Sequence, residues 1–556
     1  MRLSSMKRAR FSPFRWLRAL QVFALALVCV TGAMAQDKTP NAAASDEARL
    51  DVLEYVVEGN TLLTPAAIET VLTPFLGPGR PMADVEAARA ALEKVYQGAG
   101  YLTVFVDVPE QRVEAGVVTL KVLEGRVERL SVTGSRYFSQ GYIRERVTEF
   151  AEGRVPNFNT AQRELSGVNR SDERRVQPVL RPGLTPGTVE IELKVSDELP
   201  LESTFELNNR HAVDTEALRL SGTVRYANLF QRDHAIALTG ITAPADPKQS
   251  TVVSGTYTVP LDSGNTFVAY ALASDSTLEP LGAATVIGKG YTLGVRWVVP
   301  LSAAPSDGLH TLMLGADYKD LRERVASAGV TVLSTPLRYL PFQAAYSGSW
   351  QDGAVQTSFN GTFTFGIRRL LARTVDCPGN IGPVDQFACK REGADGGFST
   401  LRIDARQSRP MPLGGTLGLR LGGQLATQPL ASSEQYSAGG AESVRGYYEG
   451  EASGDHALFG SLEWRSPNFA KHLDSAPKPV LDELTLLGFV DVAQLYTLMP
   501  SAGQNTRTPL LGSGFGVRAR AWRSFSAELD IGWPLKATSR TPDRDARLHA
   551  RIVAKF

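Results

Sequence analysis

Alternation of apolar and polar positions dominates the chain from about Leu199 to its last residue. Between Val355 and Ile367 the odd-numbered positions are mostly apolar and the even-numbered ones polar, and residues 525–533 repeat the pattern. A half-buried soluble sheet has the same period, so one segment decides nothing. Repetition over the whole stretch, with charges on the inward phase, is typical of a transmembrane β-barrel around a water-filled lumen.

This stretch contains sixteen candidate strands, an even number that suits a closed antiparallel barrel. They are 199–209, 216–227, 233–241, 250–260, 264–273, 286–299, 308–320, 338–350, 355–367, 398–407, 413–425, 455–465, 483–494, 510–521, 524–534 and 548–556. If the first strand rises from the periplasm, the connections after even-numbered strands should be short, and most are, although 466–482 is long. The longer connections then lie on the outer side.

Two repeats precede the alternating stretch. Each begins with a strand, ending near Glu58 or Thr133, and closes with a glycine-led strand, 116–122 or 187–195. Between these strands the pattern predicts two helices and a further strand; Thr64 and Pro65 form a helix start in the first repeat. Internal periodicity of this kind indicates tandem modules. A small sheet in this order leaves an edge that can pair with an extended peptide, although a spacer role remains open.

The N-terminus has the pattern of an export signal. Six basic residues precede any acidic one, an apolar run follows from Ala19 to Val30, and Ala33-Met34-Ala35 supplies a cleavage site. We therefore predict a signal peptide over 1–35, followed by a linker over 36–49. Removal of 1–35 leaves 53 basic and 58 acidic residues, since 59 basic residues minus six is 53. This mildly acidic balance argues against nucleic acid as a partner.

The cysteines and histidines predict no metal site. Cys377 and Cys389 lie in a segment rich in Gly, Pro and Asp, and in an oxidising compartment we expect them to form a disulfide. Two thiols alone make a poor metal site, and the six histidines lack ligand spacing. Esterase and P-loop motifs are absent, and Gly512-Ser513-Gly514-Phe515-Gly516 fits lumen glycines better than a dinucleotide loop, because no βαβ unit surrounds it. We predict no catalytic residue and no cofactor.

One connection stands out chemically. The glycine-rich segment 426–454 contains Ser443-Val444-Arg445-Gly446-Tyr447-Tyr448-Glu449-Gly450, in which Arg445 lies between apolar and aromatic neighbours. A connection of this length in a compact domain is usually functional or disordered. Further on, Phe489 and Asp491 share the inward phase of a strand whose Val490 and Val492 face lipid. Our interpretation is that Arg445 and Asp491 meet inside the barrel.

The repeats resemble a known module. The strings LEGRVERLSVTGS and VNRSDERRVQPVLRPGLTPGTVEIELKVSDELPL are similar to polypeptide-transport-associated (POTRA) modules and to the second such module of two-partner secretion transporters of the TpsB type. This is the ShlB/FhaC/HecB haemolysin secretion/activation family. The resemblance predicts two α+β POTRA modules, at 50–124 and 125–198, before a 16-stranded antiparallel transmembrane β-barrel at 199–556, in the bacterial outer membrane with the modules in the periplasm.

The same resemblance extends to the barrel. Val444-Arg445-Gly446-Tyr447 matches the VRGY motif of the superfamily, and Phe489-Val490-Asp491 matches its barrel wall motif. The match implies that 426–454 folds back into the lumen and that Arg445 pairs with Asp491 as a conformational contact. The terminal Phe556 resembles the C-terminal signal of outer-membrane barrels, which implies contact with the barrel assembly machinery during biogenesis and a final position in outer-membrane lipid. Residues 36–49 are too short to hold both a plug helix and a linker.

Three hypotheses follow for the function. The first is a two-partner secretion pore that captures an unfolded TpsA-type, β-helical exoprotein in the periplasm and conducts it outward. The second is an insertase that assembles other barrels, for which two modules are fewer than expected. The third is a passive channel, for which the modules would be superfluous. We favour the first, with folding of the client outside the cell as the driving force.

Overall fold

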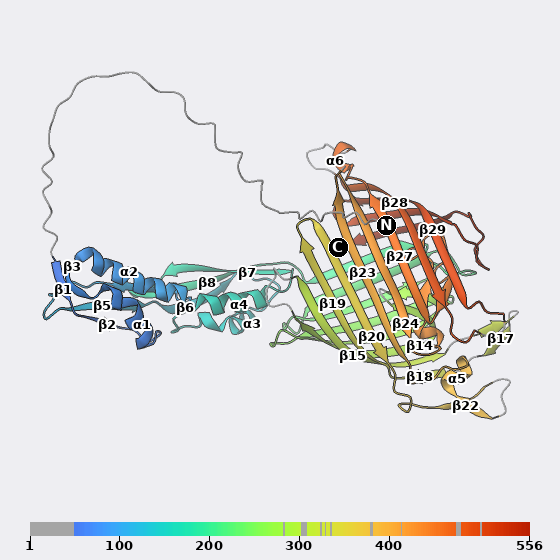
Figure 1. The fold of residues 1–556 in the computed structure, drawn as a ribbon, viewed down its shortest axis with the longest axis horizontal. Coiled ribbons are helices and arrows are strands. Elements are labelled where there is room, and N and C mark those ends of the chain that lie inside the picture. The colour runs from blue at the N-terminus through green and yellow to red at the C-terminus, as the bar shows by residue number, and fades with distance from the viewer. Residues whose placement is uncertain are drawn as a thin grey trace, which may run out of the picture.

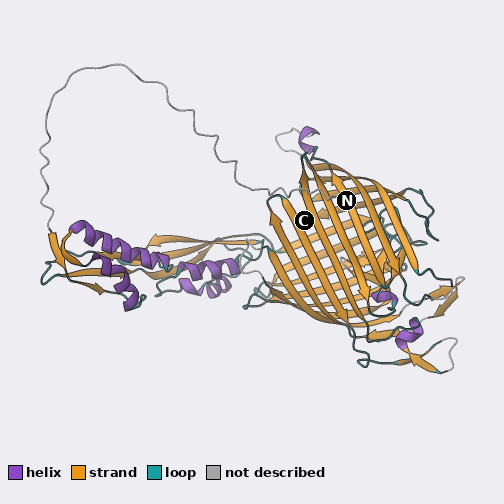
Figure 2. Ribbon diagram, viewed as in Figure 1, coloured by secondary structure: helices purple, strands orange, loops and turns teal. Residues whose placement is uncertain are grey.

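A computed structural model describes residues 49–281, 284–301, 308–322, 325–327, 330–333, 336–377, 382–412, 414–473, 480–500 and 503–556. A rod of two α+β modules leads into one end of a large β-barrel (Figure 1). Helices are confined almost entirely to the rod and to short segments at the barrel rims (Figure 2). The signal peptide predicted for 1–35 lies outside the described residues, as does the linker predicted for 36–49 except for its last residue, Arg49, which begins a strand.

The first module folds as the repeat pattern predicts, with one addition. Its elements are β1 (Arg49–Val52), β2 (Glu54–Glu58), α1 (Pro65–Leu72), the 3-10 helix η1 (Thr73–Phe75), β3 (Gly77–Pro81), α2 (Met82–Gly98), β4 (Val104–Asp107) and β5 (Val117–Glu124). The main sheet has the order β2-β5-β4, with β2 and β5 parallel. The addition is a two-stranded sheet of β1 and β3, which the sequence pattern did not indicate. Thr64 caps α1, as predicted, by accepting a hydrogen bond from the Ala67 N–H.

The second module repeats this plan. It consists of β6 (Arg126–Thr133), α3 (Gln140–Arg146), η2 (Thr148–Phe150), α4 (Phe158–Val168), β7 (Arg174–Pro182) and β8 (Thr188–Asp197), with sheet order β6-β8-β7. Both modules use a carboxylate at the end of the closing strand as a cap. Glu124 accepts hydrogen bonds from the N–H and hydroxyl of Thr61, and Asp197 accepts from the N–H groups of Arg136 and Tyr137. A separate apolar core lies under each sheet.

Sixteen strands of the described chain close into an antiparallel barrel, which confirms the predicted count. They are β9 (Leu201–Asn208), β10 (Arg219–Leu229), β11 (His234–Thr242), β12 (Ser250–Pro260), β13 (Thr266–Leu281), β14 (Ala284–Pro300), β15 (Leu309–Arg322), the interrupted strand β18–β19 (Pro336–Tyr339, Phe342–Asp352), β20 (Val355–Phe365), β23 (Ser399–Met411), β24 (Gly415–Ala426), β27 (His456–Arg465), β28 (Leu481–Tyr496), β29 (Arg507–Ala521), β30 (Phe525–Pro534) and β31 (Arg547–Lys555). Each one corresponds to a predicted strand. The largest difference is in β13, which continues on the outer side to Leu281, whereas the prediction ended at residue 273.

The last strand closes the barrel against the first. β31 pairs with β9 from Arg551–Asn208 to Lys555–Thr204. The terminal Phe556 continues the ladder, because it exchanges two backbone hydrogen bonds of 2.9 Å with Ser203. Its side chain is exposed and its ring lies edge-on against Phe525. The C-terminal residue is therefore part of the seam.

The outer surface of the barrel carries an apolar band. Exposed outward residues include Leu207, Leu220, Leu238, Val253, Leu293, Leu314, Phe363, Leu421, Leu462, Val490, Val492, Leu529 and Ile552. Exposed aromatic residues gather near the ends of strands that face the modules, namely Phe230, Trp297, Trp350, Trp464, Trp522, Phe525 and Phe556. Aromatic side chains at one rim of an apolar band mark a membrane–water interface. No helix among the described residues is long and apolar enough to cross a membrane.

The second module is bonded to the first turn of the barrel. The buried Arg174 of β7 donates hydrogen bonds of 2.9 Å to both carboxylate oxygens of Asp233, in the turn between β10 and β11. The Tyr142 hydroxyl of α3 donates a third, of 3.0 Å, to Asp233. Burial, with the nearby Asp233 carboxylate adding to it, raises the pKa of Tyr142 to about 12, so the phenol stays protonated and able to donate. The barrel end that carries these turns is therefore the module end.

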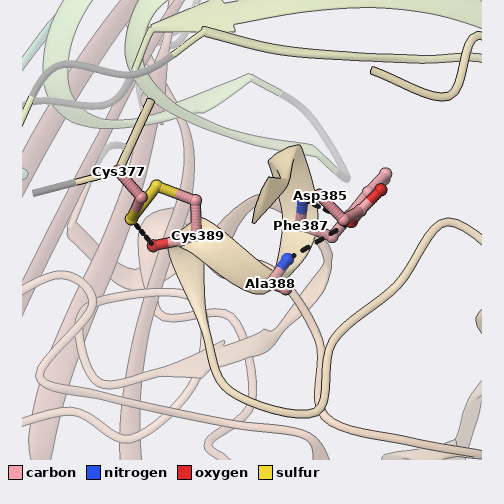
Figure 3. The surroundings of a disulfide bond; sticks show 5 residues. All are labelled: Cys377, Asp385, Phe387, Ala388 and Cys389. Carbon is pink, nitrogen blue, oxygen red and sulfur yellow. Dashed lines mark hydrogen bonds between the residues drawn. A yellow bond between two sulfur atoms is a disulfide. The ribbon is translucent and has the colours of Figure 1, made fainter. Parts of the chain in front are cut away.

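Connections at the two barrel ends follow the predicted parity. The module end has short turns, and the long exception at 466–480 includes the small helix α6 (Ala470–Leu473). At the opposite end lie the hairpin of β16 (Val325–Ser327) and β17 (Val330–Leu333), the segment of β21 (Thr374–Asp376), β22 (Pro383–Asp385) and α5 (Gln386–Lys390), and the loop after β24. Cys377 and Cys389 form the predicted disulfide beside α5, whose N-terminus Asp385 caps through the N–H groups of Phe387 and Ala388 (Figure 3).

Candidate functional site in the barrel lumen

The connection between β24 and β27 folds back into the barrel. It includes η4 (Ser432–Glu434) and a two-stranded sheet of β25 (Tyr436–Ala438) and β26 (Ala452–Gly454), and most of its residues are buried. We call residues 427–455 the lumen loop. Its Val444 and Tyr447 are fully buried in an apolar cluster with wall residues of β27, β28 and β29. The loop therefore packs against the wall like a core element.

Arg445 lies at the tip of the lumen loop and contacts Asp491 on β28. Its Nε donates to Asp491 Oδ2 at 2.8 Å, its Nη2 to Oδ1 at 3.0 Å, and its backbone N–H to Oδ2 at 3.1 Å. Arg445 is 6% exposed and Asp491 is 0% exposed. A bidentate guanidinium–carboxylate contact of this kind combines charge-assisted hydrogen bonds with a fixed orientation.

Three further wall residues complete the surroundings of the pair. Glu463 on β27 accepts a hydrogen bond from Arg445 Nη1 at 2.7 Å, and the hydroxyl of Ser461 donates to Asp491 Oδ1 at 2.6 Å. The guanidinium carbon of Arg445 lies 3.5 Å from the centroid of the Phe489 ring, a cation–π contact. All three side chains point inward, as alternation on their strands requires. Arg445 is thus held by hydrogen bonds to two carboxylates and by one aromatic face, and a third carboxylate, Asp530 on β30, lies 3.8 Å from its Nη1.

Glycines let the loop tip approach the wall. Gly446 has φ = +98°, and a Cβ there would lie 2.9 Å from the backbone nitrogen of Pro534 on β30. A Cβ at Gly512 of β29 would lie 2.0 Å from the Arg445 carbonyl oxygen, and one at Gly532 of β30 would lie 2.6 Å from the Gly446 nitrogen. These positions exclude any side chain because the backbone of the wall, at Gly446, or of the loop, at Gly512 and Gly532, occupies the space. The Gly446 N–H donates to His549 Nε2 of β31 at 3.0 Å, which places a lone pair of a neutral imidazole at this atom.

Tyr447 anchors the tip on its other side. Its hydroxyl donates to the carbonyl oxygen of Lys536 at 2.7 Å, and the carbonyl oxygen of Leu511 lies 3.1 Å away as a second acceptor for the same proton. The VRGY segment is consequently bonded to β28, β29, β31 and the connection after β30. Every residue of the motif contributes: an apolar side chain, an ion pair, a close backbone approach and a hydroxyl anchor.

A polar cavity of about 1400 Å³ lies between the loop tip and the module end of the barrel. Its lining runs from Gly414 and Asn468, beside module-end turns, to Glu442 and Arg445 at the tip. Eight arginines and five carboxylates line it; they are Arg210, Arg406, Arg420, Arg445, Arg465, Arg518, Arg520, Arg551, Glu442, Glu463, Glu483, Glu528 and Asp530. At ~30 Å³ per molecule the cavity of about 1400 Å³ has room for roughly forty-five waters. The lumen loop forms its inner floor.

Sequence patterns singled out Arg445, Gly446, Tyr447, Phe489 and Asp491, and the structure brings these five together. Cys377 and Cys389 lie at the outer rim, and Phe556 at the module-end seam. Sequence reasoning missed Ser461, Glu463 and His549. Their strands were predicted, and in the pairing of β27 with β28, Ser461 faces Asp491 and Glu463 faces Phe489. These contacts depend on the register between the two strands, and the alternating pattern within one strand does not reveal that register. In the described residues, no three potential metal ligands of the His, Cys, Asp or Glu type cluster together.

The structure is that of an outer-membrane barrel protein, because it has a closed 16-stranded barrel with an apolar outer band, preceded by two α+β modules. Its lumen is occupied by its own loop. Comparison with known families agrees: the family model "Haemolysin secretion/activation protein ShlB/FhaC/HecB" matches residues 187–519, and the model "POTRA domain, ShlB-type" matches residues 50–125. The chain belongs to the ShlB/FhaC/HecB family and is an outer-membrane transporter of a two-partner secretion system. Its modules lie in the periplasm.

The relatives that cover most of the chain are distant in sequence. The outer membrane transporter CdiB of Dickeya dadantii is 24% identical over 462 residues, which is 79% of this chain and 75% of the relative. The heme/hemopexin transporter protein HuxB of Haemophilus influenzae is 21% identical over 412 residues, which is 71% of this chain and 68% of the relative. Among solved structures, CdiB from Escherichia coli covers 93% of both chains with a TM-score of 0.59 and 17% identity. At that identity the structural likeness shows the fold alone.

Proposed function

We propose that this chain captures an unfolded, secreted exoprotein of the TpsA type in the periplasm and conducts it through the barrel to the cell surface. The observation that carries the proposal is the contact of Arg445 with Asp491. This contact fixes a loop across the lumen, so the loop must shift before a chain can pass. We propose that Arg445, Asp491, Val444, Gly446, Tyr447 and Phe489 act together as this conformational site.

The periplasmic modules supply a surface for capture. We propose that residues 50–124 and 125–198 are both POTRA modules, because the second repeats the strand pairing and the carboxylate cap of the first. On the edge of β6 away from β8, the N–H and the carbonyl of Val127 are already bonded to the backbone of Arg154 and Gly153. In the described part of the chain, β2 pairs with β5 on one side and leaves its other edge unpaired. An extended client segment can add to such an edge through backbone hydrogen bonds, which depend on an extended conformation of the client more than on its sequence.

The barrel domain, residues 199–556, takes the client from the modules. The cavity below the lumen loop is polar and mixed in charge, which suits a hydrated chain without strong binding sites for it. Transport needs no catalytic residue of this chain, since folding of the client outside prevents its return. Phe556 is the residue through which the barrel assembly machinery recognises the unfolded chain, and the apolar band then contacts outer-membrane lipid.

The proposal is tested by deleting the gene and comparing extracellular and surface proteins by mass spectrometry. Loss of one large exoprotein, restored by the wild-type gene and not by Arg445→Ala, is the expected result. A general loss of outer-membrane barrels would instead assign the insertase function. An unchanged set of secreted and surface proteins would contradict export as the function.

A further inference from the structure

A second buried ion pair holds the lumen loop at its outer end. Asp455, the last residue of the loop before β27, is 0% exposed. Its Oδ1 accepts a hydrogen bond from the N–H of Leu430, at 2.9 Å, and one from Nε2 of Gln435, at 3.2 Å. Its Oδ2 accepts from the N–H of Leu498 at 2.7 Å. One carboxylate therefore joins both ends of the lumen loop to the outer connection between β28 and β29.

The cation on this carboxylate comes from a third connection. Arg391 follows α5 in the segment between β20 and β23, and its Nη1 and Nη2 donate to the two oxygens of Asp455 at 2.7 and 2.6 Å. The same guanidinium donates to the carbonyl oxygens of Leu430 and Leu498. Its side chain is only 13% exposed. A buried bidentate pair that also satisfies neighbouring backbone groups is costly to break on one side only.

The segment that carries Arg391 is itself fixed. The disulfide to Cys377 involves Cys389, two residues before Arg391 (Figure 3). The buried Gln386 of α5 bonds with its side-chain amide to both the N–H and the carbonyl oxygen of Arg338, at 2.9 and 2.7 Å. Beneath α5 lies an apolar cluster of Leu337, Tyr339, Phe387, Ala394, Phe398, Leu430 and Ala431. The segment that positions Arg391 is therefore held in place by a disulfide, by hydrogen bonds and by an apolar cluster.

We propose that Arg391 and Asp455 form a second lock on the lumen loop, which holds its outer end while Arg445 and Asp491 hold its tip. The inference rests on the proposed function, in which the loop must move for a client to pass. Release of the tip alone leaves both loop ends tied to the outer connections. Full movement therefore requires the outer pair to open as well. Arg391 and Asp455 are positioning residues, since neither lines the cavity through which the client enters.

The test follows the position of the loop in the full chain, in the outer membrane of intact cells. Ala441 lines the cavity floor near the tip, and Ala441→Cys introduces a free thiol there. A polymer-linked maleimide, too large for the outer membrane, reaches this thiol from outside only when the loop leaves its place. Arg391→Ala should accelerate the labelling by about tenfold or more, because one buried charge loses its partner.

Arg368→Ala is the matched control. Arg368 lies in the same outer connection and pairs with Asp395, but its side chain is 72% exposed. Loss of an exposed pair changes little, so labelling of this variant should equal that of the parent. Asp455→Asn serves as a second variant that retains the shape of the acceptor, in case Arg391→Ala reduces the amount of folded barrel. It should also accelerate labelling.

Arg445→Ala in the same background separates the two hypotheses. If it accelerates labelling and neither Arg391→Ala nor Asp455→Asn does, the second lock is wrong and the proposed function stands. If no variant changes the rate of labelling, and the rate is also the same whether or not a client is being exported, the loop does not move and both proposals fail. Acceleration by Arg391→Ala and Asp455→Asn, with Arg368→Ala unchanged, supports the lock.

Discussion

Replacing Arg445 by alanine removes the centre of the lumen site and should abolish export while the barrel remains in the membrane. The change deletes two side-chain hydrogen bonds to Asp491, one to Glu463 and the cation–π contact with Phe489. Asp491 would then lie fully buried without its cation. The tip of the loop would be held only by Val444, Tyr447 and backbone contacts.

The free-energy cost of Arg445→Ala to the docked loop can be estimated. Removing one partner of a buried ion pair destabilises by about 3–5 kcal/mol. Asp491 retains the hydroxyl of Ser461 and the backbone N–H of residue 445, so the lower end of about 3 kcal/mol applies. Since about 1.4 kcal/mol corresponds to a factor of ten, the docked loop should lose about a hundredfold in its equilibrium against undocked forms.

The assay compares export of the client with the amount of folded barrel in the outer membrane, read from its heat-dependent mobility in gel electrophoresis. Arg445→Lys keeps the charge but not the bidentate geometry, and we expect intermediate export. Arg465→Ala is the control, because Arg465 bonds the same Glu463 at 2.7 Å but is 48% exposed; its export should be normal. Normal export by a folded Arg445→Ala protein would refute the reasoning.

Three further predictions concern other contacts. Gly446→Val should block export with the barrel still inserted, since φ = +98° and the β30 backbone leave no room for a side chain; export and barrel folding are measured together. Arg174→Ala should weaken docking of the second module by about 2 kcal/mol, because Asp233 loses a bidentate partner but is partly solvated; faster protease cleavage at the module–barrel junction would show this, and unchanged cleavage would contradict it. Deletion of Phe556 removes two seam hydrogen bonds and the contact with Phe525, and should lower the amount of assembled barrel in membrane fractions; wild-type amounts would contradict a role in assembly.

Local patterns were sufficient for most of the fold. All sixteen strands were predictable because a lipid-facing strand must alternate along its whole length, and the turn residues between strands interrupt that period. The helix start at Thr64 was equally local. The pairing of β1 with β3 was not predictable, because β3 reads Gly-Pro-Gly-Arg-Pro, a turn-like sequence with no strand pattern. The contact with β1 alone makes it a strand.

The candidate site divides in the same way. Arg445 and Asp491 could be proposed from their motifs, because each stands out within its own segment. Glu463 and Ser461 depend on the register of β27 against β28, and Arg391 and Asp455 on the meeting of three outer connections. Contacts between segments far apart in sequence leave no periodic trace in either segment. The glycines of the lumen wall are an exception, because the close approach of the loop requires a residue without a side chain at position 512, and this requirement is visible in the sequence.

The distance between the lumen loop and the barrel wall, with and without a client, tests the central claim most directly. Spin labels on Ala441→Cys at the loop tip and Asp352→Cys at the module-end rim would report it by pulsed electron paramagnetic resonance, in the full chain in lipid. The account predicts one narrow short-distance population at rest, and a second, longer one when a client is stalled in the barrel. A single unchanged distribution in the presence of the stalled client would contradict it.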